Sequence, residues 1–418
     1  MQDSKKWDWS VGEKTIQIND WNKSYVWVEE YQTSPDGEKI GAIVRVDEES
    51  SGICINGDLF ENTFEKIWNF RFSPNGSATA LVADMDEWTV SVDGMVWENQ
   101  FDYIWDMRFS QDGDVTAVAF QKDGKYGMAV NDTMWENTFG NMTGMTLNRS
   151  GSKSAAVVQV VPFSEGEISK FQKGIFSVCE NGEAWDGAFT NIWDIALDDS
   201  NPVTAATIRT DLYHYTISVN NTPWSTTYSC VWEPAINPKT GAVSAPVKTS
   251  SGWTLAENNH LIWNRRYKQV WGHQYLPGGK NIAAIVSPQF GKWTAAVDDN
   301  AWTVLFNEYA GSLTISPDGS HVAIIGQTDG KWFYALDGKI SGMHFDRIWE
   351  PVFSADSNHL ACKVEKNGGF SIVVDGKLFS ETFEAVWEPV FSPCGKFVLL
   401  KALNGGVYLR KVIAVDQI

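Results

Sequence analysis

Cysteine is scarce in this chain, and its few copies are far apart. The 418 residues contain five, at Cys54, Cys179, Cys230, Cys362 and Cys394. An odd number at such separations provides neither a disulfide framework nor a C-x-x-C pair for a metal or a redox reaction. We therefore expect the cysteines to be small, buried apolar side chains.

Basic residues are also outnumbered, and long apolar runs are missing. The chain has 33 Lys and Arg against 52 Asp and Glu, a formal net charge of −19. Such a charge repels a phosphate backbone, which argues against a nucleic-acid partner. No stretch approaches the ~18 apolar residues of a membrane-spanning helix, and the N-terminus lacks the apolar core of a signal peptide. We expect a cytoplasmic protein with no membrane span.

Histidine is rare, and the common catalytic and cofactor motifs are missing. The six histidines show no H-E-x-x-H spacing, and no C-x-x-C-H is present for covalent haem. No G-x-G-x-x-G, G-x-x-x-x-G-K-[ST] or G-x-S-x-G occurs either. We predict no catalytic residue, no metal site and no cofactor, and therefore a non-enzymatic protein.

What the chain does contain is a repeat of roughly 40 residues marked by aromatic side chains. In the clearest copy Trp97, Phe101 and Trp105 stand four positions apart. The middle position is aromatic in all ten copies: Tyr25, Phe64, Phe101, Phe139, Phe189, Tyr228, Tyr267, Phe306, Phe345 and Phe383. A repeat of this length indicates that one small structural unit builds the whole fold.

Each unit also carries a turn signal between two apolar runs, as in Ser316-Pro317-Asp318-Gly319. Proline presets φ at the first turn position and glycine accepts a positive φ, so this motif predicts a hairpin. A spacing of four could instead indicate a helix. The runs are short and rich in Val, Ile, Phe and Trp, which favours strands. Four strands in about 40 residues are typical of a β-propeller blade.

The number and closure of the blades follow from the two ends of the chain. The first unit opens with a fourth-strand motif around Trp21 and Tyr25, whereas the last ends after its third strand, around Tyr408 to Val415. An N-terminal strand that completes the last blade would remove the free sheet edges. We predict an all-β fold with one ten-bladed ring, residues 1–418 as a single domain, and an insertion at about 159–174. Two smaller rings are the alternative.

Two repeated residue types are the candidate functional positions. Tryptophans begin first strands at Trp68, Trp105, Trp193, Trp232, Trp271, Trp349 and Trp387. Carboxylates follow directly in five units, at Asp106, Asp194, Glu233, Glu350 and Glu388. The rings could simply fill the space between blades, and the carboxylates could be solvated. Alternatively, they form a docking surface for a protein partner, or a site for a cation or a basic partner.

The turn motif with strands on both sides resembles the WD40-like propeller repeats over nearly the whole chain. The phrases Trp97-Glu98-Asn99-x-Phe101 and Ile104-Trp105-Asp106, with 21 Trp in all, are similar to a narrower family. This is the tryptophan-rich D subunit of the Tmc transmembrane redox complex of sulfate-reducing bacteria. No functional residue of that family can be carried over.

The resemblance implies a cofactor-free cytoplasmic subunit beside an iron–sulfur protein, a membrane b-type cytochrome subunit and a periplasmic multihaem cytochrome c. Such a complex moves electrons between the periplasmic cytochrome pool and the cytoplasmic side. We therefore expect a docking subunit held at the cytoplasmic face of the inner membrane through its partners. A propeller enzyme or small-ligand binder with a site at the channel mouth is the alternative.

Overall fold

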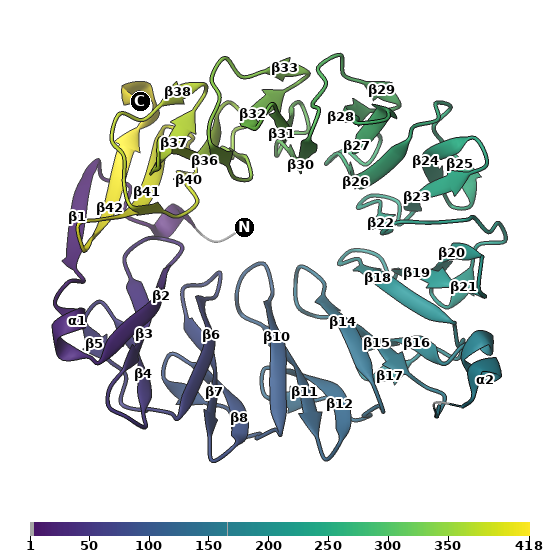
Figure 1. Cartoon of the computed structure of the whole chain (residues 1–418), viewed down its shortest axis with the longest axis horizontal. Coiled ribbons are helices and arrows are strands. Elements are labelled where there is room, and N and C mark those ends of the chain that lie inside the picture. The colour runs from purple at the N-terminus through teal and green to yellow at the C-terminus, as the bar shows by residue number, and fades with distance from the viewer. Residues whose placement is uncertain (1–3, 165) are drawn as a thin grey trace. The chain divides into compact units, whose positions relative to one another are not determined.

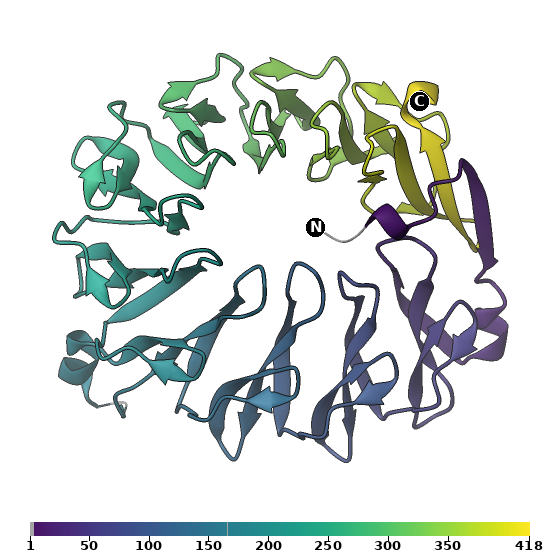
Figure 2. The same cartoon turned by 180° about the vertical axis from the view of Figure 1, so that it is seen from behind.

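The computed structural model describes residues 4–164 and 166–418. It contains ten antiparallel sheets, each built from four successive strand positions (Figures 1 and 2). The chain is a ten-bladed β-propeller, as predicted, rather than two smaller propellers.

The contacts within the chain define two compact units. The first comprises residues 1–104, 111–114 and 314–418, and the second comprises residues 105–110 and 115–313. Blades 1, 2, 9 and 10 lie in the first unit, blades 4 to 7 lie in the second, and blades 3 and 8 contribute strands to both. The assignment of residues 1–418 to a single domain stays a prediction.

The first unit contains four complete blades. Their strands are β2 (Trp27–Thr33), β3 (Ile40–Arg45), β4 (Ser51–Ile55) and β5 (Asp58–Leu59) in blade 1; β6 (Lys66–Phe72), β7 (Ala78–Asp84), β8 (Glu87–Val92) and β9 (Met95–Val96) in blade 2; β34 (Arg347–Ile348), β35 (Val352–Phe353), β36 (Leu360–Lys366), β37 (Gly369–Val374) and β38 (Lys377–Leu378) in blade 9; and β39 (Ala385–Val386), β40 (Val390–Phe391), β41 (Phe397–Asn404), β42 (Val407–Ala414) and β1 (Gly12–Gln17) in blade 10. Its short helices are η1 (Ser4–Lys6), α1 (Trp21–Ser24) and η2 (Val415–Gln417).

The second unit contains four complete blades and one short helix, α2 (Ile168–Lys173). The strands are β14 (Met142–Leu147), β15 (Ser154–Gln159), β16 (Phe176–Glu180) and β17 (Glu183–Ala184) in blade 4; β18 (Asn191–Leu197), β19 (Thr204–Arg209), β20 (Tyr215–Val219) and β21 (Thr222–Pro223) in blade 5; β22 (Ala235–Ile236), β23 (Val243–Thr249), β24 (Gly252–Glu257) and β25 (His260–Leu261) in blade 6; and β26 (Gln269–Tyr275), β27 (Ile282–Gln289), β28 (Lys292–Val297) and β29 (Asn300–Ala301) in blade 7.

Blades 3 and 8 complete the set. Their strands are β10 (Tyr103–Phe109), β11 (Thr116–Lys122), β12 (Lys125–Val130) and β13 (Thr133–Met134) in blade 3, and β30 (Tyr309–Ile315), β31 (Val322–Thr328), β32 (Lys331–Leu336) and β33 (Lys339–Ile340) in blade 8.

The repeated turns have clear local causes. In the turn that begins at Ser316, Gly319 has φ +78° and donates its N–H to the carbonyl oxygen of Ser316 at 2.9 Å. The turn after the third strand begins with Asp or Asn, whose side chain accepts the N–H of the first residue of the second strand. Asp375 accepts that of Leu360 at 2.9 Å, and Asn220 that of Thr204 at 2.8 Å. The repeated Asp and Asn thus fix the register of blades 1 to 9.

The N-terminal strand closes the last blade, as predicted. β1 runs antiparallel to β42, with Gly12 opposite Val412 and Gln17 opposite Val407, and the two strands lie side by side in both views (Figures 1 and 2). The fourth-strand motif, however, was placed too late in the sequence. Trp21 lies in α1, because the strand ends before it and the chain turns toward blade 1.

The hydrophobic core lies between neighbouring blades. The middle aromatic residues are mostly buried, and nine of them form an isolated bridge with the start of a third strand, as Phe101 does with Trp88. The expectation for cysteine holds for Cys54, Cys179 and Cys362, which are buried. It is wrong for Cys394, which is exposed because it lies in a turn, and Cys230 is only partly buried.

Candidate docking site

The first-strand tryptophans differ in exposure, although they share one position in the repeat. Trp68, Trp193 and Trp232 expose 43%, 40% and 41% of their surface. Trp105, Trp271, Trp349 and Trp387 are only partly exposed. Packing therefore accounts for most of this set. Trp193 and Trp232 lie on neighbouring blades of the second unit, in or beside the first strands of blades 5 and 6, β18 and β22, which contact each other.

Each of these two rings is stacked on an aromatic residue from the third strand of its own blade. Trp193 lies 5.5 Å from Tyr215 between ring centroids, at 28° between planes. Trp232 lies 5.5 Å from Trp253, and the planes differ by 3°. Such pairs contribute about 0.5–1.5 kcal/mol beyond area burial. The exposed rings are thus held in one orientation.

The carboxylates beside these rings are partly withdrawn from water. Burial raises the pKa of Glu233, the Gly272 N–H that it accepts at 2.8 Å opposes this, and nearby Asp194 adds to the rise. Burial of its carboxyl also raises the pKa of Asp194, although the residue as a whole is exposed. The structure therefore brings two of the five predicted carboxylates together, next to the two exposed tryptophans.

The other three predicted carboxylates have different surroundings. Asp106 forms an ion pair with Arg108 at 2.9 Å. Glu350 and Glu388 are exposed and belong to the first unit. Beside them the ammonium group of Lys363 lies 4.4 Å from the ring centroid of Trp349, a cation–π contact. The five carboxylates thus do not form one set of equivalent sites.

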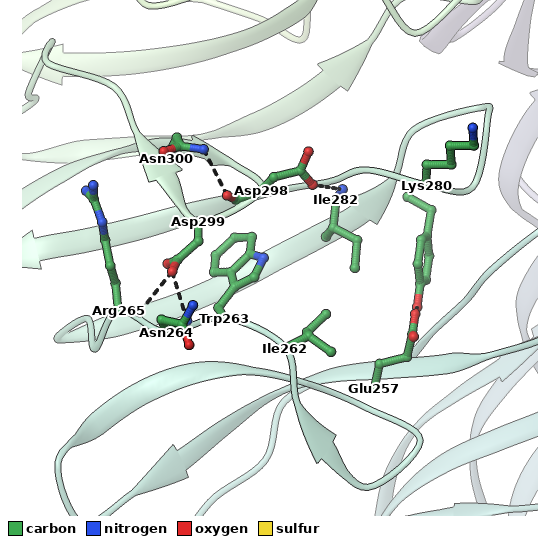
Figure 3. A pocket seen from close by; sticks show the side chains of 11 residues that line it. Glu257, Ile262, Trp263, Asn264, Arg265, Lys280, Ile282, Asp298, Asp299 and Asn300 are labelled. Carbon is green, nitrogen blue, oxygen red and sulfur yellow. Dashed lines mark hydrogen bonds between the residues drawn. The ribbon is translucent and has the colours of Figure 1, made fainter.

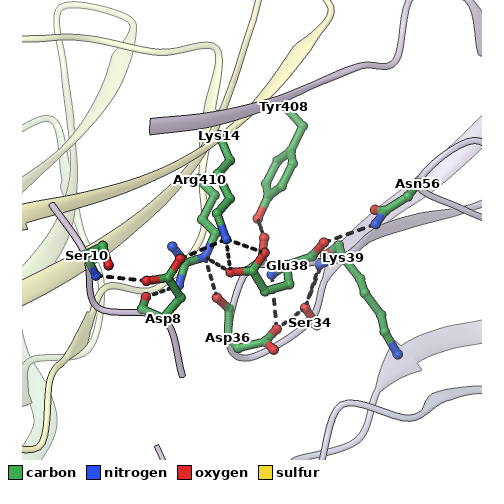
Figure 4. A network of polar contacts seen from close by, with 11 residues as sticks. Asp8, Ser10, Lys14, Ser34, Asp36, Glu38, Lys39, Asn56, Tyr408 and Arg410 are labelled. Atoms are coloured by element: carbon green, nitrogen blue, oxygen red, sulfur yellow. Dashed lines mark hydrogen bonds and ion pairs between the residues drawn. The ribbon is translucent and has the colours of Figure 1, made fainter. Parts of the chain in front are cut away.

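A second polar cluster lies in the first unit, and the repeat pattern did not predict it (Figure 4). Arg410 is 3% exposed and donates from Nε to the Asp36 carbonyl oxygen at 2.9 Å and from Nη2 to that of Asp8 at 2.6 Å. It also forms an ion pair with Glu38 at 3.0 Å, and Lys14 bonds the same carboxylate at 2.8 Å. This network ties the N-terminal segment and blade 1 to blade 10.

Lys401 lies opposite Arg410 in the same sheet and is 6% exposed. Its ammonium group makes no hydrogen bond or ion pair with any residue in the ranges that the structure describes. Burial lowers the pKa of Lys401 to about 8, against the opposing effects of Glu388 and Asp36. The equivalent sites of nine blades are Ile43, Leu81, Ala119, Val157, Thr207, Pro246, Ile285, Ile325 and Lys363. A charged residue at the centre of a second strand is the sequence signal that points to the polar cluster around Arg410.

A cavity of about 490 Å³ lies between the end of blade 6 and blade 7 (Figure 3). The Asp299 carboxylate accepts the backbone N–H groups of Asn264 and Arg265 at 2.8 and 2.9 Å. Tyr275 donates to Glu257 at 2.7 Å. These polar groups of the lining satisfy each other, so they hold the two blades together.

Neither a metal-ligand cluster nor a membrane-spanning helix occurs in the described ranges. No group of three or more His, Cys, Asp or Glu side chains there could hold a metal ion. Within the same ranges, no helix is long and apolar enough to cross a membrane.

Neither a protein-family model nor a curated protein matches the chain. Solved structures do. A crystal structure of a eukaryotic initiation factor matches with a TM-score of 0.50 and 14% identity, over 86% of this chain and 96% of the other. The Dos1 propeller matches with a TM-score of 0.34 and 12% identity, over 93% and 92%. At these identities the likeness concerns the fold alone, and the class of protein is the β-propeller.

Proposed function

We propose that this chain is a non-enzymatic docking subunit that binds a protein partner at the first strands of blades 5 and 6. The observation that carries the proposal is the pair of exposed tryptophans, Trp193 and Trp232. Each is stacked on an aromatic residue of its own blade, and the partly buried carboxylates of Asp194 and Glu233 lie beside them. Interface cores are enriched in tryptophan, and hot spots cluster around such rings.

The fixed orientation of these two rings favours binding. Because each ring is already stacked on a neighbour, a partner does not have to immobilise a free side chain, which otherwise costs about 0.5–1.5 kcal/mol per residue. The two carboxylates favour a partner segment that carries Lys or Arg, since a cation beside them offsets the cost of their burial.

The phrases that resemble the tryptophan-rich D subunit of the Tmc complex suggest which partners to test first. We propose that they are the iron–sulfur and membrane cytochrome subunits of an electron-transfer complex that links periplasmic cytochrome c to cytoplasmic redox chemistry. In that proposal the chain lies at the cytoplasmic face of the inner membrane, and its role is to hold partners together.

The experiment is capture of partners from native membranes with the tagged full-length chain. The test variant is Trp193→Ala/Trp232→Ala, and Trp68→Ala is the matched control, because Trp68 has the same repeat position and a similar exposure. We expect the wild type and the control to recover haem and iron–sulfur subunits, and the double variant to lose at least about tenfold. Recovery of the wild type alone from the soluble fraction would contradict the proposal.

A further inference from the structure

Exposed apolar side chains gather at one edge of the second unit. They lie in the connections between second and third strands of blades 4, 5 and 7. Phe290 is 94% exposed, Tyr213 76% and Ile168 66%, with Leu212 at 39% and Phe163 at 38%. Blades 4 to 7 share one topology, and their first strands contact each other in series. These connections therefore project from the same edge, and α2 lies there beside β16 (Figure 1).

In three of the four complete blades of the first unit, the same connections expose no large apolar side chain. In blade 1 the connection contains Asp47, Glu48 and Glu49, and in blades 9 and 10 it consists of Asn367-Gly368 and Gly405-Gly406. Blade 2 carries an exposed methionine, Met85. An aromatic side chain that is almost fully in water, such as Phe290, has no packing role in its own chain.

The charges at this edge are locally favourable to an anionic surface. Lys173, Lys248 and Lys268 are exposed and form no ion pair within the described parts of the chain. Among the described residues of these connections, the acidic side chains are engaged: Glu167 with Lys170 at 3.1 Å, and Asp211 with His214 at 2.7 Å. The net charge of −19 acts from farther away, and physiological salt screens exposed charges beyond about 8 Å.

We propose that this edge of blades 4 to 7 rests on an anionic lipid surface, with Phe290, Tyr213 and Ile168 inserted among the headgroups. Separate protruding side chains with lysines around them match an interface in which aromatic rings lie at headgroup depth and basic groups meet anionic lipid. A stable protein interface needs a closely packed core, which spaced single side chains do not provide. The inference does not depend on the proposed partner subunits.

The test is flotation of the full-length chain with vesicles of phosphatidylcholine containing about one-quarter phosphatidylglycerol, and with phosphatidylcholine alone. Tyr213→Ser/Phe290→Ser removes the two most exposed rings, and their exposure makes folding insensitive to the change. Met85→Ser, an 85% exposed apolar side chain in blade 2, is the matched control. We expect the wild type and control to float with the anionic vesicles, and the double variant to bind at least about tenfold more weakly.

A second pair of variants tests the contribution of the lysines. Lys173→Glu/Lys268→Glu reverses two charges at this edge, and Lys331→Glu, at an exposed lysine of blade 8, is the control. We expect the double variant to lose binding to anionic vesicles, and the control to keep it. Three results would overturn the proposal: no flotation of the wild type, equal binding of the wild type and Tyr213→Ser/Phe290→Ser, or binding to native membranes without binding to vesicles. The last result would assign the edge to a membrane protein instead of lipid.

Discussion

Blade 6 and blade 10 contain the same phrase, Trp-Glu-Pro, but use it differently. In blade 6 Trp232 is 41% exposed, Glu233 accepts the N–H of Gly272, and the centre of the second strand is Pro246. In blade 10 Trp387 packs beside Tyr408, and the centre of the sheet holds Lys401 opposite Arg410. The repeat places both tryptophans at the same position of their blades. Their surroundings differ, so one belongs to an exposed aromatic surface and the other lies beside a buried polar network.

The largest expected effect is on the buried polar network of blade 10. Arg410→Met should lower the free energy of unfolding by about 3–5 kcal/mol, because it leaves two carbonyl oxygens without their donor and removes one of the two cations that pair with Glu38. Thermal or urea unfolding measures the change. Arg108→Met is the control, since that side chain is exposed and its ion pair with Asp106 contributes at most about 1 kcal/mol. An equal loss of stability in both variants would contradict the distinction between the buried network of Arg410 and the exposed ion pair of Arg108.

Lys401 gives a pH-dependent effect in the same blade. Because burial lowers its pKa to about 8, the folded protein releases this proton at a lower pH than the unfolded chain does. The contribution of Lys401 to the free energy of unfolding is therefore least favourable below about pH 8. It becomes more favourable as the pH increases from about 8 toward the ordinary lysine pKa. Lys401→Met should be more stable than the wild type by about 2–3 kcal/mol at neutral pH.

The difference between Lys401→Met and the wild type should shrink as the pH rises from about 8 to about 10. Comparison of the two proteins at each pH cancels the titration of the buried tyrosines, whose pKa values are raised. A difference that stays constant over this range would show that the amine is not desolvated.

Glu233 should give a smaller pH-dependent effect in blade 6, and its contribution to stability should fall, not rise, with increasing pH. Burial raises the pKa of its carboxyl, so its contribution to stability is present below the ordinary glutamate pKa and is lost as the pH rises through the folded value. Glu233→Gln keeps an acceptor for the Gly272 N–H and removes the charge. We expect a gain of about 1 kcal/mol at neutral pH and none at about pH 4, measured by urea unfolding. A loss of stability at neutral pH would instead indicate a needed carboxylate.

The smallest effect on stability is expected for the exposed ring itself. Trp232→Ala should cost about 1 kcal/mol, since it removes the stacking on Trp253 and little buried area. Trp387→Ala in blade 10 should cost about 3 kcal/mol or more, because that ring packs in the core cluster with Tyr408. Thermal unfolding of the two variants compares them directly. Similar losses would mean that Trp232 is also a packing residue.

Much of the fold could be predicted because the repeat averages over ten copies. The aromatic positions counted the blades, the turn motif located the first hairpin in each, and the unmatched ends gave the closure by β1. Single-copy details could not be obtained in this way. Trp27 begins the first strand of blade 1, for example, but Glu29 is the residue equivalent to Trp68, since each lies opposite the centre of the second strand.

The candidate site was predictable only in part. The sequence identified Trp193, Trp232 and their carboxylates as members of equivalent sets. Their exposure depends on how the neighbouring blade packs, which the repeat pattern does not give. Lys401 and Arg410 escaped notice for a different reason. Lys401 is the one charge in the apolar run of β41, and Arg410 stands next to Lys411 in β42. Only the register across the sheet places Lys401 and Arg410 opposite each other.

Photo-crosslinking tests the docking proposal most directly. A photoreactive residue in place of Trp232 is compared with one in place of Trp68, each in the full-length chain in native membranes. The proposal predicts that position 232 crosslinks to a haem or iron–sulfur subunit and that position 68 does not. Crosslinks from position 68 alone, or equally from both positions, would contradict it.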